Sequence, residues 1–132
     1  MPRKRILVVE DNPINMELVC DVLEANRYEV WQATAAPEAL ERLKTGKPDL
    51  ILMDIQLPGM DGLALTKRLK QEPATRDILV VALTAHVMKG DRERILEAGC
   101  CGYLPKPIDI KELTRRVARL LGDDAATGCE TP

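Results

Sequence analysis

The sequence is poor in aromatic residues and has no excess of positive charge. Its 132 residues include no phenylalanine, two tyrosines and one tryptophan, so the core must be aliphatic and a base-stacking surface is not expected. The 19 lysines and arginines are outnumbered by 21 acidic residues, which excludes the strongly basic footprint of a non-specific nucleic-acid binder. We therefore expect no direct nucleic-acid partner.

Long hydrophobic runs are also absent. The longest apolar run covers residues 78–83, far less than a membrane span requires. At the N-terminus only residues 6–9 separate a basic start from Glu10, which is too short for the core of a signal peptide. We therefore expect a cytoplasmic protein with no membrane partner.

The cysteines and the single histidine, His86, show no spacing typical of a zinc site. Disulfides are rare in the cytosol. We therefore expect the four cysteines to be free thiols: Cys20, Cys100, Cys101 and Cys129.

Length and composition suit a single domain. Hydrophobic residues make up 45% of the chain and charged residues 30%, which is an ordinary globular mixture. After Gly122 small and polar residues dominate, as at a chain end that makes few tertiary contacts. We expect residues 1–121 to form the domain and residues 122–132 to form a flexible tail.

Five short apolar runs alternate with five amphipathic segments. Several runs are almost continuously apolar, which is typical of strands covered on both faces of a parallel sheet. Five such units predict a doubly wound α/β domain, with a five-stranded parallel sheet and five helices. The predicted strands are 5–9, 29–33, 50–53, 78–83 and 101–104. The predicted helices begin near Pro13, Pro37, Gly62, Val87 and Ile110.

Functional groups follow four of the five predicted strands. Ligands of doubly wound folds bind beyond the carboxyl ends of the strands, so these groups are expected to converge. Only the second strand ends without such a group, as an edge strand outside the site would. The groups are Glu10 and Asp11 after the first strand, Asp54 after the third, Thr84 after the fourth and Lys106 after the fifth.

The converging carboxylates predict a magnesium site and a nucleophile. Crowded carboxylates raise one another's pKa, and a divalent cation relieves this repulsion; hard oxygen ligands favour Mg²⁺. Asp54 follows the most buried run and precedes a loop, and carboxylates attack phosphorus to give aspartyl phosphate. Lys106 can neutralise charge on the transferred group, and Thr84 can donate a hydrogen bond to it.

Each of these residues also has a simpler explanation when it is taken alone. Asp11 could cap a helix, Asp54 could be a turn residue, and Lys106 could be a solvated charge. The set favours a functional site because all its members fall at strand ends of one predicted sheet edge.

Four stretches of the sequence resemble one protein family. Over residues 4–121 the chain resembles the receiver domain of a bacterial response regulator, the phospho-accepting part of two-component signalling. The resemblance implies a flavodoxin-like fold with strand order 2-1-3-4-5, Mg²⁺ as cofactor and an aspartyl phosphate. The resembling stretches are VVEDNPIN (8–15), LILMDIQLPGMDG (50–62), ILVVALTA (78–85) and GYLPKPI (102–108).

The resemblance assigns roles to the site residues one by one. Glu10 and Asp11 match the acidic pair that binds Mg²⁺, and Asp54 matches the phosphoacceptor. Gln56 matches the position whose backbone carbonyl ligates the metal, and Lys106 matches the lysine that the family carries after its last strand.

Other positions match residues that respond to phosphorylation. Thr84 matches the switch hydroxyl, and Tyr103 matches the aromatic residue that swings inward on activation. Gln56 and His86 fall where relatives vary and tune the lifetime of the phosphoryl group. The resemblance also implies a cis peptide bond between Lys106 and Pro107, which proline makes accessible.

The implied partners are other proteins. The phosphodonor is expected to be a histidine kinase or a histidine phosphotransfer protein, and Ile14, Leu18, Pro107 and Ile108 are candidate docking residues. Partial core burial would explain Leu18 equally well. The output is expected to be a change on the surface of the fourth helix, fifth strand and fifth helix, read by a downstream protein effector.

We expect no enzymatic activity beyond the protein's own phosphorylation and slow dephosphorylation. We expect either a monomer or a dimer that phosphorylation promotes. Within the family, residues 47–58, 88–91 and 98–100 resemble the single-domain, DivK-like regulators of cell division and polarity.

Four alternative functions remain at this point. A receiver excised from a hybrid histidine kinase shares most of these motifs, and a receiver-like scaffold would signal by binding alone. A phosphatase of the haloacid-dehalogenase type also uses a strand-end aspartate, but it needs a second acid where this chain has Gln56. A flavodoxin-like FMN carrier needs a hydroxyl- and glycine-rich phosphate loop, where this chain has Asp11-Asn12-Pro13.

Overall fold

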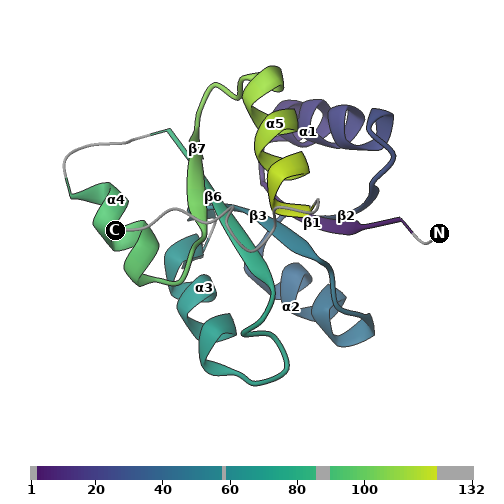
Figure 1. The fold of residues 1–132 in the computed structure, drawn as a ribbon. Helices are drawn as coiled ribbons and strands as arrows, with labels where there is room; N and C mark the ends of the chain where they lie inside the picture. The colour runs from purple at the N-terminus through teal and green to yellow at the C-terminus, as the bar shows by residue number, and fades with distance from the viewer. Residues whose placement is uncertain (1–2, 58, 86–89, 122–132) are drawn as a thin grey trace.

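Five parallel strands form a central sheet with helices on both faces (Figure 1). The computed structural model describes residues 3–57, 59–85 and 90–121. The strands of the sheet are β1 (Arg5–Val9), β2 (Glu29–Ala33), β3 (Leu50–Asp54), β6 (Leu79–Thr84) and β7 (Gly102–Pro105). The helices are α1 (Pro13–Ala25), α2 (Ala36–Thr45), α3 (Gly62–Gln71), α4 (Asp91–Glu97) and α5 (Ile110–Leu121).

The strand order is β2-β1-β3-β6-β7. This is the expected order 2-1-3-4-5 when the five parallel strands are counted in sequence order, so the predicted fold is confirmed. As predicted, β2 lies at an edge of the sheet. The sequence did not predict the short antiparallel pair β4 (Gln56–Leu57) and β5 (Met60–Asp61), which orders the loop after β3.

Successive side chains of each strand point to opposite faces of the sheet, and this divides the core into two layers. In β3, Ile51 and Met53 face one layer and Leu50 and Leu52 face the other. Side chains of α2, α3 and α4 complete the first layer, and side chains of α1 and α5 complete the second. Both faces of the central strands are therefore covered, which explains why β1 and β3 read as continuous apolar runs.

Helix α1 begins where the sequence predicted. Asn12 is its N-cap, and the Asn12 side-chain oxygen accepts hydrogen bonds from the backbone N–H of Ile14 at 2.9 Å and of Asn15 at 3.1 Å. Pro13 occupies the first helical position, where a missing N–H costs nothing. The cap fixes the direction in which the chain leaves the end of β1.

Replacing Asn12 with alanine is expected to lower the free energy of unfolding by about 1 kcal/mol, because two helix N–H groups lose their acceptor. Urea denaturation measures this change. An Asn12→Ser variant keeps a short side-chain acceptor and should lose much less. Equal stability of Asn12→Ala and the unmodified protein would show that the cap contributes nothing.

Two sequence expectations need correction. Helix α4 begins at Asp91 rather than near Val87, because Gly90 has a φ of 95° and stands before the helix in the left-handed region; residues 87–89 lie outside the described residues. Cys20 and Cys100 are free thiols as expected, but Cys101 is disulfide-bonded. The expectation for Cys101 rested on cellular compartment, which says nothing about which sulfurs approach each other.

Other expectations fall partly outside the described residues. The predicted tail, residues 122–132, and Cys129 within it are not described. Within the described residues, no helix combines the length and the apolarity that a membrane-spanning segment needs.

Candidate functional site

The strand register brings the predicted site residues together. Val9 pairs with Met53, so Glu10 leaves β1 beside Asp54 at the end of β3. Thr84 ends β6 and pairs with Pro105 of β7, so Lys106 follows immediately at the same edge. The backbone N–H of Lys106 donates to the Thr84 carbonyl at 2.8 Å. Residues far apart in sequence thus meet because their strands end together.

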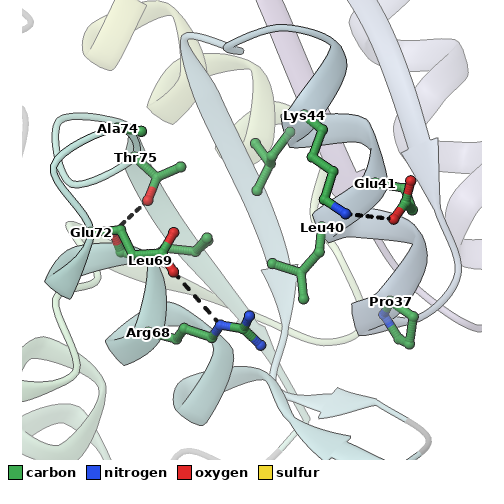
Figure 2. Close-up of a pocket in the computed structure, with 10 residues that line it drawn as sticks. Pro37, Leu40, Glu41, Lys44, Arg68, Leu69, Glu72, Ala74 and Thr75 are labelled. Carbon is green, nitrogen blue, oxygen red and sulfur yellow. Dashed lines mark hydrogen bonds and ion pairs between the residues drawn. The ribbon is translucent and has the colours of Figure 1, made fainter.

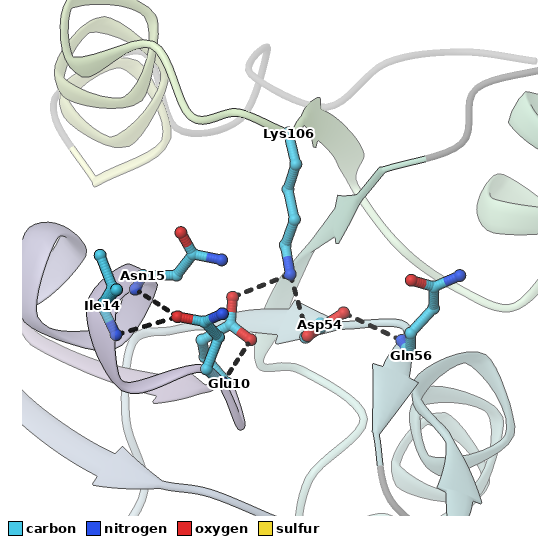
Figure 3. Close-up of polar contacts among 7 residues, drawn as sticks. Glu10, Ile14, Asn15, Asp54, Gln56 and Lys106 are labelled. Carbon is cyan, nitrogen blue, oxygen red and sulfur yellow. Dashed lines mark hydrogen bonds and ion pairs between the residues drawn. The ribbon is translucent and has the colours of Figure 1, made fainter.

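Lys106 lies between two buried carboxylates (Figure 3). Its ammonium is 2.8 Å from Oε1 of Glu10 and 3.0 Å from Oδ2 of Asp54. Glu10 is fully buried, Asp54 is 2% exposed, and the Lys106 side chain is 17% exposed. The lysine therefore supplies the positive charge that makes two buried carboxylates tolerable.

Burial raises the pKa of Glu10, and its contact with Asp54 raises that pKa further. The Lys106 ammonium and the backbone N–H of Asn12 act in the opposite direction without reversing the shift. Glu10 Oε1 accepts no hydrogen bond of good geometry from the described residues, although the ammonium is close. The contact is therefore an ion pair, and this oxygen keeps the capacity to bind another cation.

The pKa of Lys106 is raised above its ordinary value. Burial alone acts to lower that pKa, but the ion pair with Glu10 and the hydrogen bond to Asp54, together with their negative charges, outweigh it. Lys106 is therefore a cation throughout the neutral pH range. A permanent cation beside Asp54 suits the stabilisation of negative charge on a group transferred to this carboxylate.

The donor set fits a hard divalent cation. Ligand oxygens of Glu10, Asp11 and Asp54 lie within 4.8 Å of one another. Two of these carboxylates are buried, whereas Asp11 is exposed at the mouth of the site. Three carboxylates and no sulfur or imidazole ligand form a set that Mg²⁺ prefers, and the unsatisfied oxygen of Glu10 is consistent with such a ligand.

The loop after β3 positions Asp54. The backbone N–H of Gln56 donates to Oδ1 of Asp54 at 2.9 Å, so this carboxylate is held from both sides (Figure 3). Asp61 caps α3 by accepting from the N–H of Leu63 at 2.8 Å. The N–H of Gly62 donates to the Ile55 carbonyl at 3.0 Å, which draws the start of α3 against the end of β3.

A polar cavity of about 300 Å³ lies beside Thr84 and includes residues that the sequence analysis missed. Arg94 and Asp91 of α4 reach this cavity, but their helix was predicted only approximately and its orientation was unknown. Thr84 itself is buried, and Tyr103 is half-buried against the first core layer. The lining residues are Ile55, Gln56, Asp61, Thr84, Asp91 and Arg94.

The remaining candidate residues lie around the mouth of the site. Ile14 is 76% exposed and Pro107 is exposed, whereas Leu18 and Ile108 are half-buried. The Lys106–Pro107 peptide bond is cis. His86 lies outside the described residues.

A second groove, of about 520 Å³, lies between α2 and α3 (Figure 2). Leu40 and Leu69 contribute its apolar lining. Its charges are already paired within each helix, Lys44 with Glu41 and Arg68 with Glu72. It contains none of the converging strand-end groups, so we assign it no chemistry.

Fold and site together define a class of protein: flavodoxin-like α/β domains with an acidic pocket, an aspartate and a lysine at the strand ends. Comparison with known proteins narrows the class. Residues 6–118 match the family model of the response regulator receiver domain. The chain belongs to this family, whose members act in two-component signalling.

Several relatives show how far the similarity extends. The polar-differentiation response regulator DivK of Brucella ovis is 46% identical over 120 residues, which is 91% of this chain and 98% of DivK. DivK of Brucella abortus strain 2308 matches equally well. The chain is therefore similar to DivK over almost the whole length of both proteins.

Solved structures agree with the fold. A putative response regulator from Chloroflexus aurantiacus superposes with a TM-score of 0.86 at 35% identity, covering 91% of this chain and 98% of that one. The receiver domain of a sensor histidine kinase from Pseudomonas aeruginosa has a TM-score of 0.81 at 36% identity, covering 89% and 97%. That receiver was crystallised with a magnesium ion in its active-site cleft.

Proposed function

We propose that this protein is a phosphorylation-controlled switch that accepts a phosphoryl group on Asp54. The observation that carries the proposal is the placement of Asp54, which is nearly buried and is held by Lys106 and by the N–H of Gln56. These contacts hold the Asp54 carboxylate in a fixed orientation within the acidic pocket. The family shares this activity in general, and the residues named here supply its parts.

The proposed phosphodonor is a phosphohistidine on a histidine kinase or a histidine phosphotransfer protein. An Asp54 oxygen attacks phosphorus, the phosphorus–nitrogen bond breaks, and its electron pair returns to the imidazole, which is protonated. Lys106 stabilises the negative charge of the transferred group. Thr84, buried at the end of β6, can donate a hydrogen bond to it.

We propose that Glu10, Asp11 and Asp54 hold Mg²⁺, with the backbone carbonyl of Gln56 as a further ligand. When bound, the ion neutralises carboxylate and phosphoryl oxygens. The similar receiver domain from P. aeruginosa supports this proposal through its magnesium ion. Among the described residues, the cluster that could hold the ion consists of carboxylates alone, and such hard oxygen ligands favour Mg²⁺.

The proposed output is the surface of α4, β7 and α5. Phosphorylation adds about 1.5 to 2 negative charges at Asp54, next to a cavity that Thr84 shares with Arg94 of α4. Movement of Thr84 toward the phosphoryl group frees space that half-buried Tyr103 can enter. This change shifts the relative populations of two states of the surface, and a downstream protein effector binds one of them. Gln56 and His86 tune the lifetime of the phosphoryl group.

Similarity to DivK supports a single-domain regulator of this kind. A receiver from a hybrid histidine kinase is the second candidate, since a kinase receiver from P. aeruginosa shares the fold at 36% identity. Both candidates predict the same chemistry at Asp54. They differ in the protein that supplies or receives the phosphoryl group.

Intact mass after incubation with Mg²⁺ and acetyl phosphate tests the proposal. We expect a mass increase of one phosphoryl group that requires Mg²⁺, survives acid and is lost in base. The Asp54→Ala variant should show no such increase, and Asp77→Ala, an exposed carboxylate outside the site, serves as the control.

An adduct on Asp54→Ala would overturn the assignment of the acceptor. No adduct on the unmodified protein would overturn it as well, provided that beryllofluoride also fails to bind, since its binding would reveal a short-lived phosphoryl group. The protein would then be a receiver-like scaffold that signals by binding alone.

A further inference from the structure

Helix α1 carries a stripe of negative charge. Its 13 residues include no lysine or arginine, and Glu17, Asp21 and Glu24 are all exposed. These carboxylates repel one another at spacings of four and three residues, and Glu24 stands in the last turn, where the helix dipole disfavours an anion. None of the three forms an ion pair with a described residue. The stripe therefore weakens its own helix.

Helix α5 carries the opposite charge. Lys111, Arg115 and Arg119 follow at four-residue spacing and are exposed, on the side away from the buried face of the helix. Arg115 donates to both oxygens of Glu112, but Lys111 and Arg119 form no ion pair with a described residue. Counted over whole helices, the formal charge is −3 for Pro13–Ala25 and +3 for Ile110–Leu121.

The two helices are neighbours on one face of the sheet (Figure 1). The acidic stripe borders a groove between α1 and β2, on the side of α1 away from α5. Exposed apolar side chains stand at the first turns of both helices: Ile14 is 76% exposed and Ile110 is 48% exposed, the exposed large hydrophobics of the described residues. The face thus has an acidic side, a basic side and apolar residues at one end.

We propose that this α1/α5 face binds a second copy of this chain across a two-fold axis. In a two-fold contact each patch meets its counterpart reciprocally, so the acidic stripe of one copy faces the basic stripe of the other, twice. The equal and opposite helix charges make the contact electrically balanced. A uniformly acidic or uniformly basic partner would be attracted by one helix and repelled by the other.

This arrangement has a regulatory consequence, which rests on the proposed function. Ile14 and Leu18 lie on the same face and are candidate docking residues for the phosphodonor. A second copy therefore competes with a protein phosphodonor for this face. It leaves the carboxyl ends of the strands open, so a small donor such as acetyl phosphate still reaches Asp54.

Sedimentation equilibrium with charge-reversed variants tests the proposal, and a non-reducing denaturing gel excludes intermolecular disulfides. The unmodified chain should pass from monomer to dimer as its concentration rises, and added salt should shift it back. Asp21→Lys/Glu24→Lys and Lys111→Glu/Arg119→Glu should each weaken dimerisation about tenfold or more. An equimolar mixture of the two variants should recover a dimer, because each supplies the charges that the other has lost.

The control is Lys47→Glu/Lys67→Glu, which makes the same change in net charge as Lys111→Glu/Arg119→Glu but away from α1 and α5, and should dimerise like the unmodified chain. A monomer at every concentration, a dimer that survives the reversals, or a mixture without recovery would each overturn the proposal. Phosphorylation by acetyl phosphate should be intact in all variants. Its loss would count against the proposed function, not against this interface.

Discussion

Replacing Gly62 with alanine is expected to destabilise the protein by about 3 kcal/mol and to weaken binding of Mg²⁺. A Cβ at this position would lie 2.3 Å from the backbone oxygen of Asp54 and 2.7 Å from the Cα of Ile55. No side-chain rotation relieves a clash between a Cβ and backbone atoms, so α3 must move away from the end of β3. That movement would displace Asp54, the proposed phosphoacceptor.

Gly59 provides the matched control in the same loop. Its φ is 76°, but a Cβ there would meet nothing within 4 Å. Gly59→Ala should therefore cost only the left-handed backbone strain, about 1–2 kcal/mol, and should leave Mg²⁺ binding intact. Urea denaturation and Mg²⁺ titration of both variants test the difference. If Gly62→Ala were as stable as Gly59→Ala, close approach of the backbone would not be what requires glycine at position 62.

The sequence predicted most of the site because the chemistry lies at the ends of continuous apolar runs. Because β1 and β3 are covered on both faces, each forms a continuous apolar run whose end marks the end of the strand. The parallel register of the two strands then places Glu10 beside Asp54. Lys106 was found in the same way, after the last strand. Convergence follows from topology once the strand ends are known.

Other features depend on contacts that sequence patterns do not carry. Glu10 and Asp11 are adjacent and look equivalent in the sequence, yet the first is fully buried and the second is exposed. The sequence predicted Gly62 only as the start of a helix, because its close approach to the backbone of Asp54 and Ile55 is a tertiary contact that no local pattern reveals. Arg94 was missed because the orientation of α4 is set by packing of Ile95, not by a visible motif.

Lys106→Met is expected to cost about 3 kcal/mol of unfolding free energy at neutral pH, because removing one partner of a buried ion pair leaves the other charges uncompensated. Here one ammonium serves two carboxylates, Glu10 at 2.8 Å and Asp54 at 3.0 Å. The methionine side chain fills a similar volume, so packing changes little. Phosphorylation of Asp54 should fall sharply, because the transferred group loses its cation.

The loss should depend on pH. The pKa of Lys106 is raised above 10.5 in the folded protein, so its stabilising effect is fully present below pH 10.5 and disappears as pH rises through the folded value. The pKa of Glu10 is raised above 4.5 by burial and by Asp54. Without Lys106 the pKa of Glu10 rises further. The Lys106→Met variant therefore loses stability as the pH increases from 4.5 through this raised pKa. The free energies of unfolding of Lys106→Met and of the unmodified protein should differ least near pH 4 and most between neutrality and pH 10.

Magnesium should partly reverse the defect. A dication at Glu10, Asp11 and Asp54 replaces the missing charge, and any ligand that binds only the folded state stabilises it. The Tm increase that Mg²⁺ produces should therefore be larger for Lys106→Met than for the unmodified protein. Lys47→Met, at an exposed lysine distant from the site, should show neither the loss nor the larger Mg²⁺ response. An equal Mg²⁺ response in both proteins would mean that the metal does not bind at the carboxylates that Lys106 holds.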